Sequence, residues 1–392
     1  MRIQSLDILR GMTIAGMIVV NNPGGGDENA YAPLQHAEWI GLTPTDLVFP
    51  FFMFIMGMTT FLSLRHTGFR WSGHTALKVV RRALGLWLIG LAITWLFMFT
   101  RGMLSPENAG LPLAERARVA ANVLDHIRLL GVMPRLGICY GLAAMCALTF
   151  HRHVLPLLIL LIFGGYAWLL ATHGGYVHDA TNILAIVDNA VLGPSHVYRG
   201  DCPDPEGLLS TLPALAHVLL GFCVARHVFG FQRSTTKTTT ADTVGINLTL
   251  IRLFFFSVCI LVAGLLLADF VPISKKLWTP SFSLITCGLA SLLLTLLTLV
   301  VDRMKWLHYT STFFRVIGVN PLALFILSDL LLIPFALLPL CHGVSVQTFT
   351  YNWLVSLGMT VQLASLIWAL AYLLVNWLIG LALYKGRIYI KL

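Results

Sequence analysis

Long apolar segments alternate with polar ones along the whole chain. A helix needs about 20 apolar residues to cross roughly 30 Å of hydrocarbon, and segments of about this length recur about ten times. They lie near residues 5–22, 46–64, 79–100, 129–150, 154–172, 207–229, 248–268, 278–301, 313–338 and 355–384. The pattern predicts an all-α polytopic membrane protein with about ten transmembrane helices.

Composition supports this interpretation and argues against a nucleic-acid-binding protein. Of the 392 residues, 57% are hydrophobic and only 11% are charged, and the mean hydropathy is +0.81. In a soluble protein the net charge of +9 would suggest nucleic acid, but here the position of each Lys and Arg matters more than their number. We expect a lipid bilayer and no nucleic acid among the partners.

Basic residues gather in alternate loops, and most acidic residues lie in the others. Because cytoplasmic loops carry an excess of Lys and Arg, both termini are expected in the cytoplasm, together with the linker-like segment RSTTKTTTAD at 233–242. The loops that hold His36, His196 and Glu206 are then external. The linker divides the chain but not the fold, so we expect one integral-membrane domain over residues 1–392.

The first apolar segment and the cysteines give further expectations. No cleavable signal peptide is visible, because the segment carries Asp7 and Arg10 and no small-residue cleavage site follows it. Of the seven cysteines, Cys202 and Cys341 lie outside the apolar segments, and a disulfide between them stays open. The cysteines form no metal-spaced pair, and no metal is expected.

Several motifs of soluble enzymes are absent. The chain has no G-x-S-x-G, H-E-x-x-H, G-x-x-x-x-G-K-[ST] or paired C-x-x-C, which removes the serine hydrolase, zincin and P-loop interpretations. The long external loops, 23–45, 101–128 and 173–206, are then the informative regions. The middle one has apolar residues at helical spacing and predicts a helix on the membrane surface.

His36 lies in the first of these loops. Taken alone, an interfacial histidine is more often satisfied by a backbone carbonyl than used in catalysis. Here Asn21 closes the first apolar segment and Asp46 opens the second at the same face, so an amide and a carboxylate can converge on the imidazole and hold its tautomer. For Asp46, capping of a helix that follows Thr43 and Pro44 is the stronger interpretation.

Other charged residues face the same external side. Glu206 belongs to DPEG, which predicts a helix start capped by Asp204, and it would also supply an anion for an amine substrate. Arg135, in GVMPRLGICY, could join Lys275 and Lys276 in holding an anionic ligand such as a nucleotide phosphate. Snorkelling explains each of these cations singly.

Polar residues interrupt the ninth apolar segment. Asn320 precedes Pro321, and Asp329 follows inside the same segment. An acid inside a membrane helix is a functional candidate, whereas a proline kink explains the first pair. Asn320 and Asp329 are therefore included as candidate substrate-binding residues.

Seven stretches of the chain form a recognisable set: SLDILRGMTIAGMIVVN, LQHAEWIGLTPTDLVFPFFMFIMG, GVMPRLGICY, LGPSHVY, DPEG, VPISKKLW and the terminal YKGRIYIKL. Together they resemble the heparan-α-glucosaminide N-acetyltransferase family of transmembrane acyltransferases. The second motif is long and specific, and the shorter ones support it. Together they span nearly the whole chain.

The resemblance implies an enzyme that transfers acetyl from acetyl-CoA to the amino group of a terminal glucosamine. The family's catalytic pair, a histidine in the first external loop and an asparagine at the end of the preceding helix, matches His36 and Asn21. By the same matching, Asp46, Arg135, Glu206 and Lys275 fall on residues that the family places around the active site. Taken together with the candidates from the residues themselves, the predicted set is His36, Asn21 and Asp46 as catalytic residues, Glu206, His196, Asp329 and Asn320 as substrate-binding residues, and Arg135, Lys275 and Lys276 as residues that bind the co-substrate acetyl-CoA.

Three departures from the family's pattern bear on the acceptor. The chain lacks the large luminal N-terminal region and extra leading span of the lysosomal enzymes, has PGGGDENAYAP in place of a tighter glycine turn, and has Ile40 where the family often has asparagine. These favour a multi-pass protein of the bacterial inner (cytoplasmic) membrane that acts on a small amino sugar or cell-envelope glycan. A secondary transporter for an amino sugar is the alternative. A homodimer, the side of donor entry and an acetyl-histidine intermediate stay open.

Overall fold

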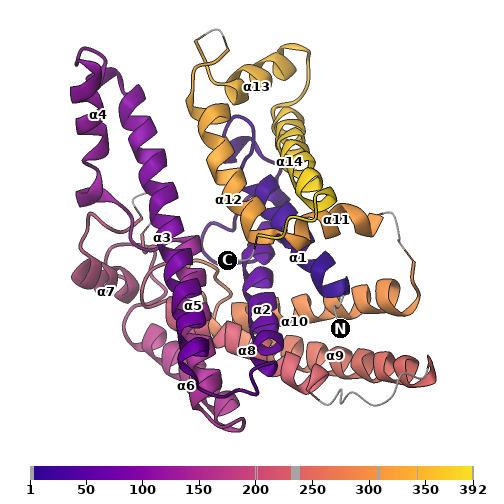
Figure 1. Cartoon of the computed structure of the whole chain (residues 1–392). Helices are drawn as coiled ribbons and strands as arrows, with labels where there is room; N and C mark the ends of the chain where they lie inside the picture. Colours follow the sequence, from indigo (N-terminus) through magenta and orange to yellow (C-terminus); the bar gives the residue numbers. More distant parts are fainter. Residues whose placement is uncertain are drawn as a thin grey trace.

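The structure is a computed structural model that describes residues 4–198, 200, 202–230, 239–306, 310–341 and 343–390. These residues form fourteen α-helices and no strand (Figure 1). The helices are α1 (Gln4–Val20), α2 (Pro44–Arg65), α3 (Gly73–Leu104), α4 (Leu113–Ala121), α5 (Val132–Thr149), α6 (Val154–Thr172), α7 (Ile183–Leu192), α8 (Thr211–Phe229), α9 (Thr239–Ala268), α10 (Pro280–Leu297), α11 (Thr310–Val319), α12 (Pro321–Leu332), α13 (Val346–Ser356) and α14 (Val361–Lys385). The predicted all-α class is confirmed.

The helices fit a multi-pass membrane protein. Within the described ranges, eight are long and apolar enough to cross a membrane, or nine if α11 and α12 form one bent span. The sequence predicts about ten, and the difference is α1. Its 17 residues measure about 25 Å along the helix axis, somewhat less than a typical hydrocarbon core.

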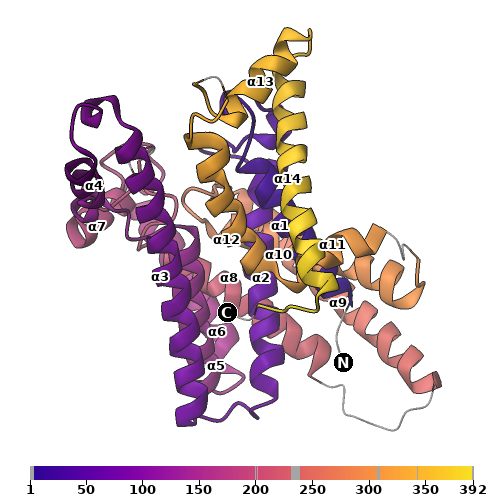
Figure 2. The same cartoon turned by 45° about the horizontal axis from the view of Figure 1, so that its top comes forward.

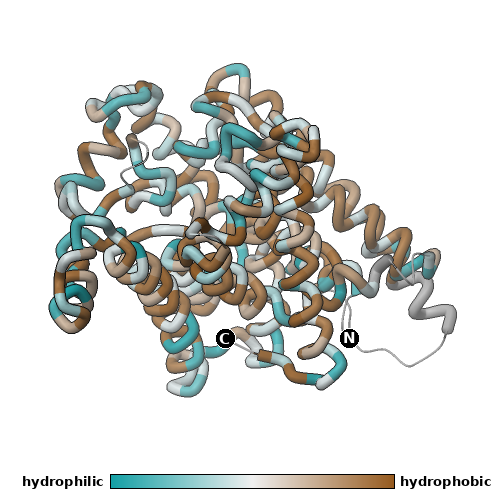
Figure 3. The backbone as a smooth tube through the Cα atoms, turned by 90° about the horizontal axis from the view of Figure 1, so that it is seen from above, coloured by the Kyte–Doolittle hydropathy of each residue, from teal (hydrophilic) through white to brown (hydrophobic). Residues whose placement is uncertain are grey.

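The helices α2 and α8 form the centre of the bundle. Within their spanning parts, 72% of α2 and 78% of α8 are buried, against 11% of α3 and 22% of α9. Glycines let the two central helices touch, because a Cβ on Gly57 would collide with the backbone of Val218, and one on Gly221 with that of Phe54. The helical stretches are mainly apolar along their length (Figure 3), and we expect the outer faces of α3 and α9 to contact lipid.

The first helix packs against the C-terminal helices as well as against α2. It contacts α11, α12 and α14, and glycines again allow the close approach. A Cβ on Gly11 would collide with the backbone of Phe314, and one on Gly318 with the backbone of Asp7. The first helix of the chain therefore packs against helices from its C-terminal part.

A sharp bend separates α11 from α12. The two segments meet at 85° at Asn320 and Pro321, so the predicted proline kink is present. The buried Asn320 side chain donates from Nδ2 to the Ile388 carbonyl over 2.8 Å and accepts the Ile390 N–H at Oδ1 over 2.9 Å. Asn320 thus binds the backbone of the C-terminal segment, at Ile388 and Ile390, next to the bend.

Two helix starts differ from the predicted ones. DPEG does not begin α8, which starts at Thr211. Asp204 instead caps a separate turn, in which Glu206 N donates to its Oδ1 over 2.9 Å and Gly207 N to its carbonyl over 3.0 Å. The expected span at 355–384 begins only at Val361, because Gly358 breaks the helix with a φ of +87°.

The loop at 101–128, which is expected to be external, contains one short α-helix, α4. Its nine residues pack against the end of α3, where Trp95 donates from Nε1 to the Ala121 carbonyl over 3.3 Å. The α3–α4 hairpin stands apart from α13 and α14 in both views (Figures 1 and 2). A helix in this loop is confirmed, and its place on the membrane surface stays a prediction.

Two other expectations concern the linker and the cysteines. Residues 233–238 of the expected cytoplasmic linker lie outside the described residues, and α9 begins at Thr239. No disulfide joins Cys202 to Cys341 or any other pair of the seven cysteines, all of which lie among the described residues.

Candidate active site

Loops that are far apart in the sequence meet at one end of the bundle. The loop that carries His36 is joined to the segment before α10 by a hydrogen bond of 2.8 Å from Gly41 N to the Ile273 carbonyl. A small apolar cluster around Leu277 and Tyr166 packs beneath them, together with Trp39. These contacts hold the His36 loop against the segment that carries Lys275.

Asp46 fixes the orientation of His36. The Oδ1 atom of Asp46 lies 2.7 Å from His36 Nδ1. Its Oδ2 atom accepts the Ala37 N–H over 3.1 Å, the Thr43 N–H over 3.2 Å and the Thr43 hydroxyl over 3.0 Å. The predicted capping role is therefore present, and the same carboxylate also holds the imidazole. An ionised carboxylate only accepts, so Nδ1 is the donor and Nε2 of the neutral ring keeps its lone pair.

Lys275 completes this group, which we call the His36 group (His36, Asp46 and Lys275). Lys275 Nζ lies 3.1 Å from His36 Nδ1, 3.4 Å from Nε2 and 3.6 Å from Asp46 Oδ1. Nearly equal distances to both ring nitrogens place the ammonium over the face of the ring, because an in-plane position at these distances would overlap the Cε1–H group. Burial lowers the pKa of Lys275, and the charges of Asp46 and Glu206 offset only part of that effect.

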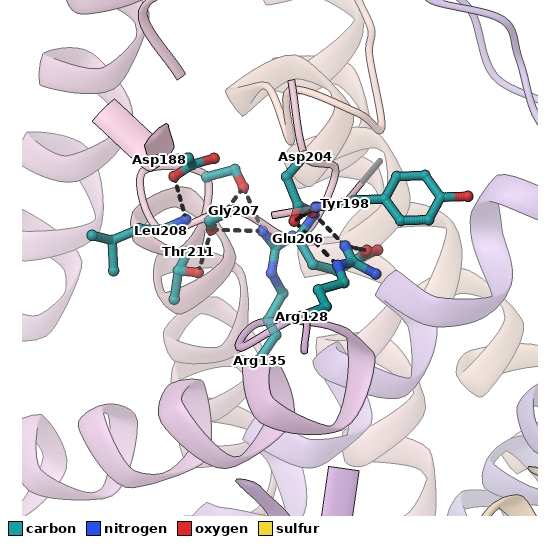
Figure 4. Close-up of polar contacts among 10 residues, drawn as sticks. Arg128, Arg135, Asp188, Tyr198, Asp204, Glu206, Gly207, Leu208 and Thr211 are labelled. Carbon is teal, nitrogen blue, oxygen red and sulfur yellow. Dashed lines mark hydrogen bonds and ion pairs between the residues drawn. The ribbon is translucent and has the colours of Figure 1, made fainter. Parts of the chain in front are cut away.

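A second charged group lies nearby, centred on two arginines. Arg128 donates from Nε to Asp204 Oδ2 over 3.1 Å, contacts Asp204 Oδ1 through Nη2, and donates from Nη2 to Glu206 Oε2 over 2.6 Å (Figure 4). Its guanidinium also lies 4.7 Å from the ring centroid of Tyr198. Glu206, which is predicted to supply an anion for an amine substrate, is thus ion-paired with Arg128.

Electrostatics match this pairing. Burial alone would lower the pKa of Arg128, but Glu206 and Asp204 raise it above its usual value. Burial likewise works to raise the pKa of Glu206, and the charges of Arg128 and Arg135 bring it below its usual value. Both side chains are therefore charged and form an ion pair with each other.

Arg135 is fully buried under the same turn. It donates from Nη2 to the Gly207 carbonyl over 3.1 Å and to the Ser210 hydroxyl, as Figure 4 shows for Gly207. Its guanidinium lies 5.2 Å from the centroid of the Trp278 ring, while Nε and Nη1 have no hydrogen-bond partner among the described residues. Arg135 therefore connects α5 to the turn before α8 and to the segment that carries Lys275. We call Arg128, Arg135, Asp204 and Glu206 the arginine group.

Two predicted residues lie at the same end but outside both groups. The Asn21 side chain is exposed at the end of α1 and makes no hydrogen bond within the described residues, whereas the adjacent Asn22 is buried and donates to the Ile18 carbonyl over 2.8 Å. His196 donates from Nδ1 to the Ile127 carbonyl over 2.8 Å, and its own carbonyl accepts the Leu129 N–H over 3.1 Å. His196 thus anchors the residues on both sides of Arg128.

Two other predicted residues lie away from His36. Gly318 touches Asp7 near the start of α1, so Asn320 sits toward the opposite end of α1 from Asn21. Asp329 is half-buried on α12, and no contact in the described part of the chain links it to the His36 group. Lys276 is half-buried next to Lys275.

Sequence reasoning did not find three residues that shape this region. Arg128 and Arg135 both lie among apolar residues in IRLLGVMPR, so the pattern that makes Arg135 a candidate also marks Arg128. Asp188 is an isolated acid in an apolar run, and Trp278 is one of ten tryptophans. Their contacts come from distant segments and leave no local pattern.

Comparison with known proteins agrees with the resemblance found in the sequence. Residues 2–252 of the 392 match the family described as heparan-alpha-glucosaminide N-acetyltransferase, catalytic. The chain belongs to this family. The part of the chain that matches this N-acetyltransferase family contains His36, Asp46, both arginines of the arginine group and Glu206. Lys275 lies beyond the matched part.

Two curated relatives carry the name heparan-alpha-glucosaminide N-acetyltransferase. The protein from Homo sapiens is 27% identical over 388 residues, which cover 83% of this chain and 52% of the relative. The protein from Mus musculus is 26% identical over 383 residues, which cover 83% of this chain and 53% of the relative. The chain therefore spans about half the length of these relatives.

Proposed function

We propose that this protein is a membrane-embedded acetyltransferase that moves acetyl from acetyl-CoA to the amino group of glucosamine or a related amino sugar or glycan. Family membership supports the reaction class. The observation that carries the proposal for this chain is the His36 group, in which a half-exposed imidazole is held by a buried carboxylate. His36 and Asp46 have side-chain exposures of 45% and 1%.

His36 can act as a general base. An amino sugar reaches the site as an ammonium ion, which must lose a proton before its nitrogen attacks a carbonyl. The Nε2 lone pair accepts that proton, and the imidazolium then forms next to ionised Asp46. The amine nitrogen bonds to the thioester carbonyl carbon, the carbon–sulfur bond breaks, and CoA leaves as a thiolate that takes a proton. One N-acetyl amine and one CoA thiol result.

His36 can also carry the acetyl group itself. In that route Nε2 attacks the thioester, CoA leaves, and the amine then attacks the acetyl-imidazole. In either route Asn21, whose amide is free of hydrogen bonds within the described chain, is our candidate donor to the developing oxyanion. Both routes need the same Nδ1 contact with Asp46.

The donor's phosphates need cationic partners. We propose that Lys275 and Lys276 supply them, since both are partly accessible near His36. Arg135 is buried, and its contacts go to Gly207, Ser210 and Trp278, so we propose that it serves the donor site by bracing the loops. The acceptor roles predicted for Glu206 and His196 are likewise proposed to act through Arg128 and its segment.

We further propose that the His36 end faces outward from a bacterial inner membrane and that both termini are cytoplasmic. Charge asymmetry supports this orientation. Single cysteines placed in each loop and labelled with an impermeant thiol reagent test it. Labelling of residues 233–242 from outside would show that the orientation is the reverse of the proposed one.

A purified-protein assay tests the proposed function. The protein in detergent is given acetyl-CoA with and without glucosamine, and both CoA thiol and N-acetylglucosamine are measured. We expect thiol release only with glucosamine, in equal amount to the product. Counterflow of labelled glucosamine in vesicles free of CoA, without any product, would support a transporter instead.

A further inference from the structure

The turns after α2 and α5 and the end of α8 meet at the end of the bundle opposite the His36 group. All three helices begin at the end that carries the His36 group and the arginine group, and they therefore finish at the other one. There Arg65 of α2 donates from Nη1 to the Phe229 carbonyl of α8 over 2.8 Å. The start of α3 packs on α5, where the Arg82 guanidinium lies 4.4 Å from the ring centroid of Tyr140. Figure 2 shows the turn between α2 and α3 at the end away from α4 and α13.

These turns carry cations and no acid. Segments 65–82, 149–154 and 224–230 hold seven Lys and Arg residues and no Asp or Glu. Arg152, in the turn between α5 and α6, is exposed, and Arg226, near the end of α8, is half-buried. The excess of cations in cytoplasmic loops accounts for the sign of this charge, but not for the way in which these two arginines are placed.

Arg152 and Arg226 lie close enough for the charge of one to act on the other. Arg226 makes no hydrogen bond or ion pair within the described ranges. Arg152 donates from Nε to His153 Nε2 over 2.9 Å, and its two terminal nitrogens have no acceptor in the part of the chain that the structure describes. Two guanidinium groups that repel each other and have unused donors are stabilised by an anion that contacts both, and a phosphate accepts such paired donors.

An apolar surface continues from Arg152 along α6. Val154, Leu157 and Leu161 are exposed, and their spacing of three and four residues places them on one face of the helix. Because α6 contacts α8, this face and the two arginines belong to neighbouring helices. Cations at the end of an apolar helix face match the two parts of a phospholipid, its headgroup and its acyl chains.

We infer that Arg152 and Arg226 form a binding site for the headgroup phosphate of an anionic phospholipid, whose acyl chains lie along the exposed face of α6. A lipid phosphate is favoured over a dissolved one, because a single ligand then contacts both the arginines and the apolar face. A zwitterionic headgroup brings a cation of its own to turns that offer no acid, so a lipid with net negative charge is preferred. The inference goes beyond the proposed function, since the site lies at the end of the bundle opposite His36.

Thermal unfolding with defined lipids tests the site. The purified full chain in detergent is titrated with phosphatidylglycerol or with phosphatidylcholine of the same acyl chains, and unfolding is followed by intrinsic fluorescence. A ligand that binds the folded state raises the melting temperature, and we expect phosphatidylglycerol to do so at a lower concentration than phosphatidylcholine. The double variant Arg152→Gln with Arg226→Gln should need at least about tenfold more phosphatidylglycerol for the same rise, because it loses charge-assisted contacts.

Two further variants make the test specific. Lys385→Gln with Arg387→Gln is the matched control, because it removes two exposed charges at the end of α14, which is the same end of the bundle. This control should keep the wild-type response to phosphatidylglycerol. Arg152→Gln alone changes an exposed side chain and should leave the fold intact, so it should lose part of the response without a lower melting temperature in the absence of lipid.

Three results would overturn the inference. The first is a wild type that responds equally to the two lipids, and the second is a double variant that keeps the full response to phosphatidylglycerol. The third is stabilisation of the wild type by sodium phosphate or CoA, at matched ionic strength, that equals the effect of phosphatidylglycerol and disappears in the double variant. That result would assign the two arginines to a soluble phosphate instead of a lipid.

Discussion

The His36 group and the arginine group lie at the same end of the bundle and use the same kinds of side chain, yet they differ in how far they are saturated. The His36 side chain is 45% exposed, and its Nε2 keeps bonding capacity. Arg128 and Glu206 are 22% and 13% exposed, and each is bound to an opposite charge. A group with unused capacity can bind and exchange protons, whereas a saturated one holds loops in place.

The two groups also depend on each other. Arg135 binds the turn that carries Glu206 and packs on Trp278, three residues after Lys275. Arg135 thus connects the turn of the arginine group to the segment that carries Lys275. This division of labour predicts large losses of turnover from one group and losses of stability from the other.

The largest expected effect is on turnover in His36→Ala. General base catalysis contributes about 10²–10⁴, so we expect at least a hundredfold loss of turnover in the glucosamine-dependent release of CoA, with thermal stability unchanged. Glu38→Ala, which alters an exposed neighbour, is the control and should keep wild-type turnover. Equal losses in both variants would show that the loop, and not the imidazole, matters.

Arg135→Ala should act on the fold. It removes the donor to the Gly207 carbonyl and the Ser210 hydroxyl, and each buried acceptor left without a partner costs about 1–3 kcal/mol. We expect a clearly lowered melting temperature in detergent, measured by intrinsic fluorescence, and poor yield. Lys275→Ala is the comparison: it should melt close to the wild type and raise the KM for acetyl-CoA roughly tenfold or more. A stable Arg135→Ala protein with weakened donor binding would assign Arg135 to direct phosphate contact.

Asp46→Asn separates the two functions of that residue. Asparagine caps helices about as well as aspartate, so the start of α2 should survive. The imidazolium that forms during proton transfer loses its adjacent negative charge, and we expect a roughly ten- to hundredfold loss in kcat with little change in KM. Wild-type kcat in Asp46→Asn would show that Asp46 serves the helix alone.

Much of the His36 group was predictable, and little of the arginine group. His36 and Asp46 lie close in the sequence at the start of one segment, so their contact follows from topology, whereas Asn21 lies at the same end but outside the group. Thr43 and Asp46 also carry a local capping pattern. DPEG carries a local pattern too, but the ion pair from Glu206 to Arg128 holds it as a separate turn before α8.

Contacts between distant segments account for the remaining differences. Asp204 and Arg128 lie 76 positions apart, and nothing in either segment indicates the other. Asp188 likewise contacts Gly207 and Leu208 from a distant segment, and nothing in its own segment indicates them. Asn320 looked like a polar interruption of a span, and its partners, Ile388 and Ile390, are backbone groups that any sequence would offer.

The smallest expected effect is a pH-dependent change in stability at Asp188. Burial raises its pKa to about 6 in the folded protein from the ordinary 3.8, so its contribution to stability is fully present below about pH 4 and is lost as the pH rises through 6. The full shift corresponds to about 3 kcal/mol at most. Asp188→Asn should therefore melt increasingly above the wild type as the pH rises from 4 to 7. A constant difference over that range would show that Asp188 does not titrate there.

The most direct test of the role of His36 is chemical rescue of His36→Ala with free imidazole. The half-exposed position leaves access for a small molecule, and imidazole restores a ring nitrogen without repairing any other contact. We expect glucosamine-dependent CoA release by His36→Ala to rise with imidazole concentration, while that of Asp46→Asn stays unchanged. Turnover of a correctly folded His36→Ala protein that is near the wild-type value, or that does not respond to imidazole, would contradict the proposal that this ring nitrogen carries the reaction.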